Sequence, residues 1–164
     1  ILFGPDNWLE WLNTIEHDSK QFNFDEDGLC KKYRYTQQFS WKVDKHNPLR
    51  QWVNTFYKDE DLNLVNVYNI PPGGYLFPHI DNNPHPHLNK VYVAIRWPQG
   101  NHFGFNGFGE MPVTDRSAWL INNYRYSHWV YNDSDENRLV MAIAGNLEGI
   151  SDLIYRSWMK MLAK

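Results

Sequence analysis

Between positions 62 and 144 the chain is a succession of short segments rich in valine, isoleucine and aromatic residues. Such segments favour extended backbone, and each is ended by glycine, proline or a group of polar residues. No stretch between them has the length and periodicity of a crossover helix, which argues against a parallel sheet built from βαβ units. Strands are predicted at 62–70, 75–80, 90–97, 101–108, 117–122, 126–131 and 138–144. Along 90–97 the residues alternate, so Val91, Val93, Ile95 and Trp97 are expected to share one face of the strand.

Helical signals flank this run of strands. Asp6 can cap a helix over 6–15, and Asn47 followed by Pro48 predicts the start of a second helix over 47–56. The polar stretch 18–28 is predicted to be a loop, and 31–43 to hold one or two strands. Helices before and after a set of short strands predict a mainly β protein with flanking helices, a double-stranded β-helix (jelly roll, cupin-like).

The 164 residues are expected to form a single domain with a sizeable core. Its parts would be a helical N-terminal region over about 1–60, a jelly-roll core over about 61–146, and a C-terminal helix over about 151–163. The net charge of −3 gives no basic field, so no nucleic-acid partner is expected. The sequence does not indicate an oligomeric state.

Cys30 is the only cysteine, which excludes an intrachain disulfide and a thiolate metal cluster. No apolar run approaches the roughly 18 to 20 residues needed to cross a bilayer, so no membrane association is expected. Nothing in the chain has the pattern of a signal peptide. A cytoplasmic location is therefore expected.

Two histidines and an aspartate have the spacing of a metal site. His79 and Asp81 are two positions apart, so on one strand they point to the same face. His128 would reach them from the later strand at 126–131. Two imidazoles and one carboxylate with open positions opposite them are the ligand set of non-haem Fe(II) oxygenases. We predict that these three residues hold Fe(II) as a catalytic centre.

Other interpretations of these residues stay open. His85 and His87 form a second pair that could ligate a metal with His128 in the manner of cupins, without 2-oxoglutarate. Their loop has no strand to fix it, which favours a solvated or pocket-edge segment. A non-catalytic jelly-roll module is a third interpretation, because the 8 Trp, 10 Tyr and 9 Phe include rings that could stack on sugars or peptides.

Arg138 follows His128 by ten positions and begins the strand at 138–144. A buried arginine is costly unless an anion pairs with it, and its own strand offers no acid. We predict that it binds the distal end of a dicarboxylate, although an arginine at a strand entrance can also be a surface residue. A hairpin across 132–137 is predicted, in which Asn132 must pair with Arg138 to turn His128 and Arg138 to one interior.

These residues resemble the aspartyl/asparaginyl β-hydroxylase family of Fe(II)- and 2-oxoglutarate-dependent dioxygenases. The resemblance covers about 64–144 and is carried by PGGYLFPH ending at His79, KVYVAIRWP from Lys90, SHWVY around His128 and NRLV around Arg138. It implies hydroxylation of an unactivated C–H bond in an amino acid or a peptide or protein side chain. The co-substrates would be 2-oxoglutarate and O2, and succinate and CO2 would be released.

The resemblance also implies roles for single residues. His79, Asp81 and His128 would hold iron, and Arg138 would grip the distal carboxylate of 2-oxoglutarate. Tyr68 occupies a position where the family places a hydroxyl for that carboxylate.

Lys90 and Tyr92 fall where the family has basic residues near the carboxylate beside the keto group. Asp81 departs from the vertebrate peptide hydroxylases of the family, which lack a carboxylate ligand. It is similar in this to small bacterial members that hydroxylate free amino acids such as proline. Substrate contacts are expected from His102, Arg96 and Trp97.

Overall fold

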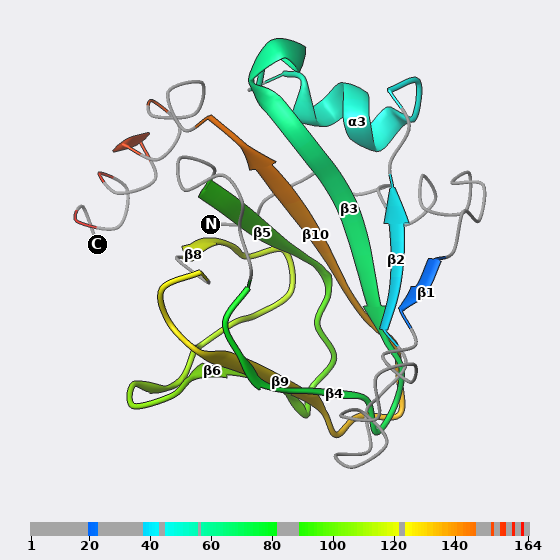
Figure 1. The fold of residues 1–164 in the computed structure, drawn as a ribbon, viewed down its shortest axis with the longest axis vertical. Helices are drawn as coiled ribbons and strands as arrows, with labels where there is room; N and C mark the ends of the chain where they lie inside the picture. The colour runs from blue at the N-terminus through cyan, green and yellow to red at the C-terminus, as the bar shows by residue number, and fades with distance from the viewer. Residues whose placement is uncertain are drawn as a thin grey trace.

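The computed structural model describes residues 20–22, 38–42, 45–55, 57–81, 89–121 and 124–146, with five further residues near the C-terminus. Two antiparallel sheets face each other, and a short helix packs outside the larger one (Figure 1). The larger sheet, sheet A, has the order β1 (Lys20–Phe22), β2 (Gln38–Lys42), β3 (Leu62–Ile70), β10 (Arg138–Gly145), β5 (Asn89–Arg96) and β8 (Ala118–Ile121). The smaller, sheet B, has the order β4 (Tyr75–His79), β9 (His128–Asn132), β6 (Asn101–Phe105) and β7 (Gly109–Glu110).

From β3 onward the chain passes repeatedly between the two sheets. Strands β3, β5, β8 and β10 belong to sheet A, and β4, β6, β7 and β9 to sheet B. A chain that winds alternately through two facing antiparallel sheets forms a double-stranded β-helix. The predicted mainly β fold is therefore confirmed, and every strand predicted between 62 and 144 is present with small shifts at its ends.

The predicted hairpin between 126–131 and 138–144 is wrong. Strand β9 pairs with β4 and β6, whereas β10 pairs with β3 and β5 in the other sheet. The segment between them crosses from sheet to sheet, so Asn132 and Arg138 are not ladder partners. Local turn chemistry favoured a hairpin, but two-sheet winding separates strands that are neighbours in the sequence.

Asn132 fastens this crossing. Its side chain is fully buried and donates from Nδ2 to the carbonyls of Ile70 and Glu136, both at 2.9 Å. Its Oδ1 accepts from the backbone N–H and the hydroxyl of Ser134 at 3.1 and 2.6 Å. Its backbone exchanges hydrogen bonds with Gly73 and Gly74. One residue thus joins the end of β9 to the end of β3 in the opposite sheet.

Two apolar cores lie on the two faces of sheet A. The outer core packs helix α3 (Pro48–Val53) on the sheet, with Leu49 and Val53 fully buried, each contributing about 1.5–3 kcal/mol. Asn47 caps this helix as predicted, accepting from the Leu49 N–H at 2.9 Å. The 3-10 turn η2 (Asp59–Asp61) leads from the helix side into β3.

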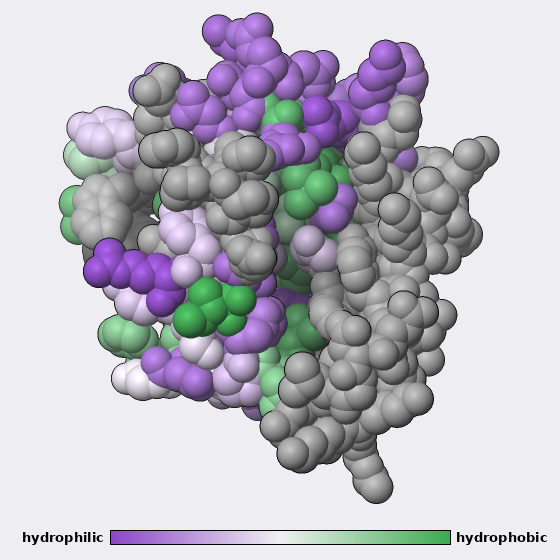
Figure 2. Space-filling view, viewed as in Figure 1, coloured by the Kyte–Doolittle hydropathy of each residue, from purple (hydrophilic) through white to green (hydrophobic). Residues whose placement is uncertain are grey.

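The inner core fills the space between the sheets. It joins Ile70, Ala94 and Val140 of sheet A to Phe103 and Val130 of sheet B. In the space-filling view hydrophobic residues are visible near the middle of the molecule, with polar residues gathered above them (Figure 2). The inner face of each sheet is therefore the surface on which a site can be built.

A bulge in β5 changes the predicted alternation of 90–97. Leu139 pairs with Arg96 but Val140 pairs with Ala94, so Ile95 is an extra residue. Val91, Val93 and Ile95 share one face as predicted and pack in the outer core, whereas Trp97 turns into the inner core. The prediction that Trp97 shares the face of Val93 is therefore wrong, because the bulge shifts the alternation by one residue.

The segments outside the barrel give a mixed outcome. The helix predicted over 6–15 lies outside the described residues. Strand β1 lies within the predicted loop at 18–28, where pairing with β2 provides order that the local sequence does not indicate. The region 31–43, predicted to hold one or two strands, contains β2. Asp152, Tyr155, Arg156, Met159 and Leu162 are helical and exposed. Within the described part of the chain, no helix has the length and apolarity needed to span a membrane.

Candidate metal centre

His79 and His128 are brought together by an irregular pairing of β4 with β9. Leu76 pairs with Val130, but His79 pairs with His128, so two residues of β4 oppose one residue of β9. This is a β-bulge at Phe77 and Pro78, where proline supplies no N–H to the ladder. In a regular ladder His79 would point to the face opposite Leu76. The bulge turns it inward, to the side of His128.

The three side chains converge on one point. The Nε2 atoms of His79 and His128 lie 3.3 and 3.8 Å from the same oxygen of Asp81, Oδ1. The two imidazole rings are 4.4 Å apart between centroids. One donor atom from each residue can be chosen so that all lie within 4.8 Å of one another. The predicted face of two imidazoles and a carboxylate is thus assembled in the structure.

Backbone carbonyls fix which nitrogen of each imidazole is free. The Nδ1 of His79 lies 2.6 Å from the carbonyl of Phe77, and the Nδ1 of His128 lies 3.4 Å from that of Tyr126. A carbonyl oxygen only accepts, so both Nδ1 atoms carry the proton and donate it. This leaves the Nε2 lone pairs for a metal, which is the usual way in which a ligating histidine is oriented.

Lys90 holds the other oxygen of the carboxylate. Its Nζ donates to Oδ2 of Asp81 at 2.7 Å from the neighbouring sheet. Burial raises the pKa of Asp81, but the hydrogen bonds from His79 and Lys90 outweigh this effect and hold it below its usual value. Asp81 is therefore ionised at neutral pH, with Oδ1 directed at the two histidines.

The two histidines titrate differently. The hydrogen bond to Asp81 raises the pKa of His79, against the opposing effect of burial. Burial lowers the pKa of His128, and the neighbouring charge of His79 lowers it further. Without a metal, the pair therefore favours a proton on His79 and a neutral His128.

Arg138 lies on the inner face of sheet A and is almost completely buried. Its guanidinium carbon is 4.5 Å from the centroid of the Trp97 ring, and its Nε has no hydrogen-bond partner among the described residues. Burial lowers the pKa of this guanidinium to about 9, while the nearby Tyr92 favours its charged form. The cation is therefore charged at neutral pH and no carboxylate of the described residues pairs with it.

Strand register places the other predicted cofactor contacts on the same inner face. Tyr68 pairs with Val140, and Lys90 and Tyr92 pair with Ala144 and Ala142. Trp97 also belongs to this side, through its contact with Arg138. The side chains of these residues therefore lie on the same inner face as Arg138.

Two other predicted substrate contacts lie elsewhere. His102 pairs with Tyr131 on the outer face of sheet B, stacks on its ring and binds Glu110 at 2.7 Å. Strand alternation turns it away from His128. Arg96 is in register with Leu139, whose side chain packs in the outer core. The structure therefore does not bring these two residues to the metal centre. His85 and His87 lie outside the described residues.

Sequence reasoning missed the aromatic wall of the inner space. Trp119 stacks on Tyr92 at 5.9 Å and meets Trp97 edge-on at 5.8 Å, and its buried Nε1 has no hydrogen-bond partner in the part of the chain that the structure describes. Phe103 and Phe105 lie 6.1 and 6.2 Å from the ring of His128. The alternation of β6 and β8 identifies which residues share a face, but not which face is inside.

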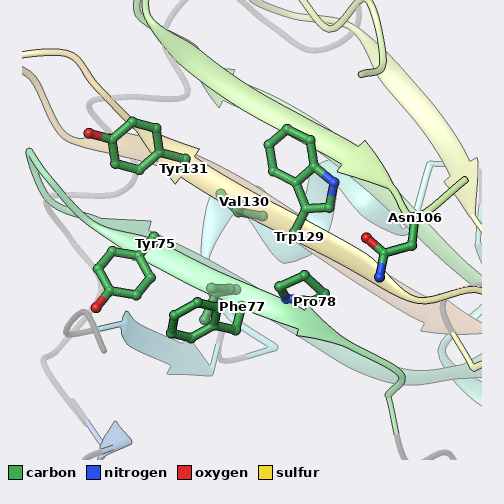
Figure 3. A pocket seen from close by; sticks show the side chains of 8 residues that line it. Tyr75, Phe77, Pro78, Asn106, Trp129, Val130 and Tyr131 are labelled. Carbon is green, nitrogen blue, oxygen red and sulfur yellow. The ribbon is translucent and has the colours of Figure 1, made fainter. Parts of the chain in front are cut away.

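A second concavity lies on the opposite side of sheet B. It has a volume of about 470 Å³, and Tyr75, Phe77, Trp129 and Tyr131 line it from β4 and β9 (Figure 3). The indole of Trp129 lies flat over Gly104, where a Cβ atom would be only 2.5 Å from the ring. None of the three predicted ligands lines this groove, so it is separate from the metal centre.

A scan of protein-family models and a search of curated proteins each gave no match. Solved structures that resemble the chain include proteins with a cupin or double-stranded β-helix domain. One is a prolyl-4-hydroxylase from Pseudomonas putida, with 12% identity and a TM-score of 0.49, covering 68% of this chain and 70% of that one. Another is a predicted oxalate decarboxylase from Thermotoga maritima, with 15% identity, a TM-score of 0.44 and coverages of 68% and 82%.

A third is a cupin 2 conserved barrel domain protein from Salinispora arenicola, with 16% identity, a TM-score of 0.37 and coverages of 56% and 70%. At this level of similarity the likeness concerns the fold alone. The resemblance to the aspartyl/asparaginyl β-hydroxylases is not recovered by these comparisons. Function therefore has to be argued from the residues of the site.

The residues present fit a divalent metal ion. Both histidines have Nε2 directed at Asp81 Oδ1, and Nδ1 is occupied by a carbonyl. Two neutral imidazoles and one carboxylate suit Fe(II) and leave other coordination positions to water or a ligand. A buried guanidinium with an unpartnered Nε on the same inner surface fits an acidic second ligand.

Proposed function

We propose that this chain is an Fe(II)- and 2-oxoglutarate-dependent dioxygenase that hydroxylates an unactivated C–H bond of an amino acid or of a peptide or protein side chain. The observation that carries the proposal is Arg138, a buried cation in the interior that holds the metal face, for which the described residues provide no carboxylate partner. A metal centre alone needs no such residue. A dicarboxylate co-substrate does.

The charges of the interior support a dianionic ligand. Lys90 and Asp81 form an ion pair and neutralise each other. A bound divalent ion would then leave its own charge and that of Arg138 unbalanced among the described inner residues. Unpaired charge in a low-dielectric interior is costly, and a ligand with two carboxylates would offset it. 2-Oxoglutarate has this charge and the keto group that chelation requires.

In this proposal each residue of the site positions either the metal ion or the co-substrate. His79, Asp81 and His128 would hold the ion by three protein ligands, and Lys90 would keep Asp81 Oδ2 away from it. Arg138, steadied by the face of Trp97, would hold the distal carboxylate by charge-assisted hydrogen bonds.

Tyr92 and Trp119 would form an apolar wall along the co-substrate and exclude water from it. When bound, Fe(II) supplies the redox chemistry by which O2 converts 2-oxoglutarate to succinate and CO2 while its second oxygen atom enters the substrate C–H bond. Exclusion of water would keep this oxidation directed at the substrate rather than at the neighbouring rings.

A spectroscopic titration tests the proposal. Fe(II) and 2-oxoglutarate added without oxygen should give a weak visible charge-transfer band, which Asp81→Ala should abolish. His102→Ala is a matched histidine control on the other face of the sheet and should leave the band unchanged. Arg138→Met should weaken 2-oxoglutarate about tenfold to a hundredfold, the scale of charge-assisted bonds, and spare metal affinity.

Release of succinate separates this proposal from a cupin-like metalloenzyme that does not use 2-oxoglutarate. Such an enzyme would bind metal through the same residues but would give neither the band nor succinate. A binding module would show no dependence on Asp81 at all. Absence of both band and succinate in wild-type protein that binds Fe(II) would refute the dioxygenase assignment.

A further inference from the structure

A chain of aromatic contacts leads from the metal centre to the surface of the protein. The ring of Phe105 lies 6.2 Å from that of His128 and 6.5 Å from that of Tyr126. Tyr126 in turn contacts Phe108 edge-on at 5.6 Å. Exposure increases along this path, from 5% for His128 to 40% for Tyr126 and 76% for Phe108. The path therefore connects the metal centre to an exposed aromatic surface.

The outer end of this path is held in place by hydrogen bonds. Asn106 donates from its backbone N–H to the carbonyl of Ser127 at 2.9 Å, and from Nδ2 to the Ser127 hydroxyl at 3.2 Å. The N–H of Phe108 donates to the carbonyl of Phe105 at 3.1 Å, closing the tight turn between β6 and β7. The exposed Phe108 ring is thus presented by a tied turn that is fixed to the segment carrying His128.

A cation lies beside these rings. The guanidinium carbon of Arg125 is 5.7 Å from the centroid of the Tyr126 ring. Arg125 is exposed, and within the described ranges no carboxylate comes within ion-pair distance of it. Stacking on an aromatic face orients a guanidinium and leaves its N–H fork free for an anion.

We propose that Arg125, Tyr126 and Phe108 bind an acidic peptide segment of the substrate, with an apolar side chain on the rings and a carboxylate at Arg125. This inference rests on the proposed function, and it selects a peptide or protein rather than a free amino acid as the substrate. The segment would run outward along the ring path while one of its residues enters the metal centre.

The length of the path of rings favours a peptide over a free amino acid as the ligand. Each ring-to-ring step is about 6 Å, and an extended chain advances about 3.3 Å per residue, so one step corresponds to about two residues. A free amino acid that reached His128 would leave Tyr126 and Phe108 uncovered. A nucleic acid would meet a single cation here on a chain of net charge −3, which does not favour it.

The test uses an array of octapeptides with acetylated and amidated ends. Half of them contain glutamate or aspartate beside leucine or phenylalanine, and half carry glutamine or asparagine instead. Binding of the full chain, loaded with Fe(II) and 2-oxoglutarate without oxygen, is measured by fluorescence anisotropy. Acidic peptides should bind about tenfold or more tightly than their amide counterparts, the scale of a hydrogen bond to a charged group.

Variants then assign the preference to residues. Arg125→Gln should abolish the acidic preference, and Arg125→Lys should retain part of it. Phe108→Ala should weaken acidic and amide peptides alike, by about threefold to tenfold for one exposed ring. Tyr131→Ala removes an exposed ring from the outer groove, and Lys45→Gln removes an exposed positive charge; neither should change binding.

Slow succinate release by wild-type protein without any peptide reports the proposed function independently of peptide binding. Its absence in wild type would refute the dioxygenase assignment while leaving the peptide result to stand or fall alone. Equal binding of acidic and amide peptides, or binding of none, would overturn the inference. So would acceleration of succinate release by free amino acids when no peptide has this effect.

Discussion

Arg138 places a positive charge in a part of the core where the described residues offer it no carboxylate. Removing a guanidinium from water costs several kcal/mol, and stacking on Trp97 returns only about 1–2 kcal/mol of this. The residue is therefore unfavourable for the stability of the ligand-free fold. Its presence is understandable if binding, not packing, has determined it.

Arg138→Met should accordingly make the metal-free protein more stable, by roughly 1–4 kcal/mol in free energy of unfolding, because an apolar side chain of similar length replaces an unpaired charge. Urea denaturation monitored by tryptophan fluorescence measures this change. Metal affinity of the same variant serves as the control that the barrel is intact. A loss of stability greater than about 1 kcal/mol would show that the guanidinium has a structural partner.

The metal centre should bind more tightly as the pH rises. The hydrogen bond to Asp81 raises the pKa of His79, so protonated His79 stabilises the metal-free fold below about pH 6.5. This stabilisation is lost as the pH rises through the raised, folded-state pKa. A metal ion needs the same Nε2 without its proton, so metal affinity increases over the same interval.

Competition with a chromophoric chelator between about pH 6 and 8 measures this increase, and calorimetry in two buffers measures the proton released. His102→Ala should leave the profile unchanged, because that histidine lies on the other face of the sheet. A metal affinity that does not vary with pH would contradict the assignment of a proton to His79.

The bulge in β4 acts at the scale of the strand. Phe77 and Pro78 together oppose one residue of β9, so β4 has one residue more than a regular ladder would have. This extra residue in β4 determines the face on which His79 lies. Pro78→Val would provide the missing N–H and favour a regular ladder, in which His79 turns outward. We expect metal affinity to fall about tenfold, as for other groups that orient ligands.

Deleting Phe77 in the Pro78→Val variant is a matched rescue. The deletion removes the extra residue, so a regular ladder again pairs His79 with His128, and metal affinity should recover. Metal titration of both variants, with circular dichroism to confirm the fold, checks the outcome. If the single variant binds metal like wild type, the orientation of His79 does not depend on the bulge.

Local patterns predicted the strands because period-2 alternation and turn residues are properties of neighbouring positions. They also predicted that His79, Asp81 and His128 converge and that Arg138 lies in the interior, because ligand chemistry limits which residue types can occur together at these spacings. They did not predict the bulges, the turn of Trp97 into the inner core or the outward orientation of His102. Each of these depends on register with a partner strand that is distant in sequence.

The pairing of strands into sheets was likewise not predictable from the loop at 132–137. Its polar residues satisfied the criteria for a hairpin, and only the buried hydrogen bonds of Asn132 show that the segment crosses between sheets. The predicted hairpin paired Asn132 with Arg138, which would have turned His128 and Arg138 to the same face of one sheet. In the structure they share an interior because each lies on the inner face of its own sheet.

At the scale of the whole molecule, the charges of the metal site and of Arg138 predict that binding of the metal ion and binding of 2-oxoglutarate depend on each other. A divalent ion alone, or 2-oxoglutarate alone, balances only part of the interior charge. Together they should raise the melting temperature by roughly 5–10 °C beyond the ion alone when the acid is saturating. Differential scanning fluorimetry with Mn(II), which resists oxidation in air, measures this rise.

2-Oxobutyrate is the matched control ligand, because it keeps the keto acid end and lacks the distal carboxylate. It should raise the melting temperature much less, and equally in wild type and Arg138→Met. An equal effect of the two acids on the wild-type protein would show that Arg138 does not bind the distal carboxylate.

The two ends of the barrel are fastened by different kinds of bond. At one end Asn132 joins the sheets through neutral, buried hydrogen bonds, and at the other Lys90 and Asp81 join them through an ion pair. Added salt weakens the second kind far more than the first. High ionic strength should therefore increase local opening at the metal-bearing end, while the opposite end remains closed. In amide exchange, loss of protection would begin at β4 and β5 near Asp81 and spare the Asn132 crossing.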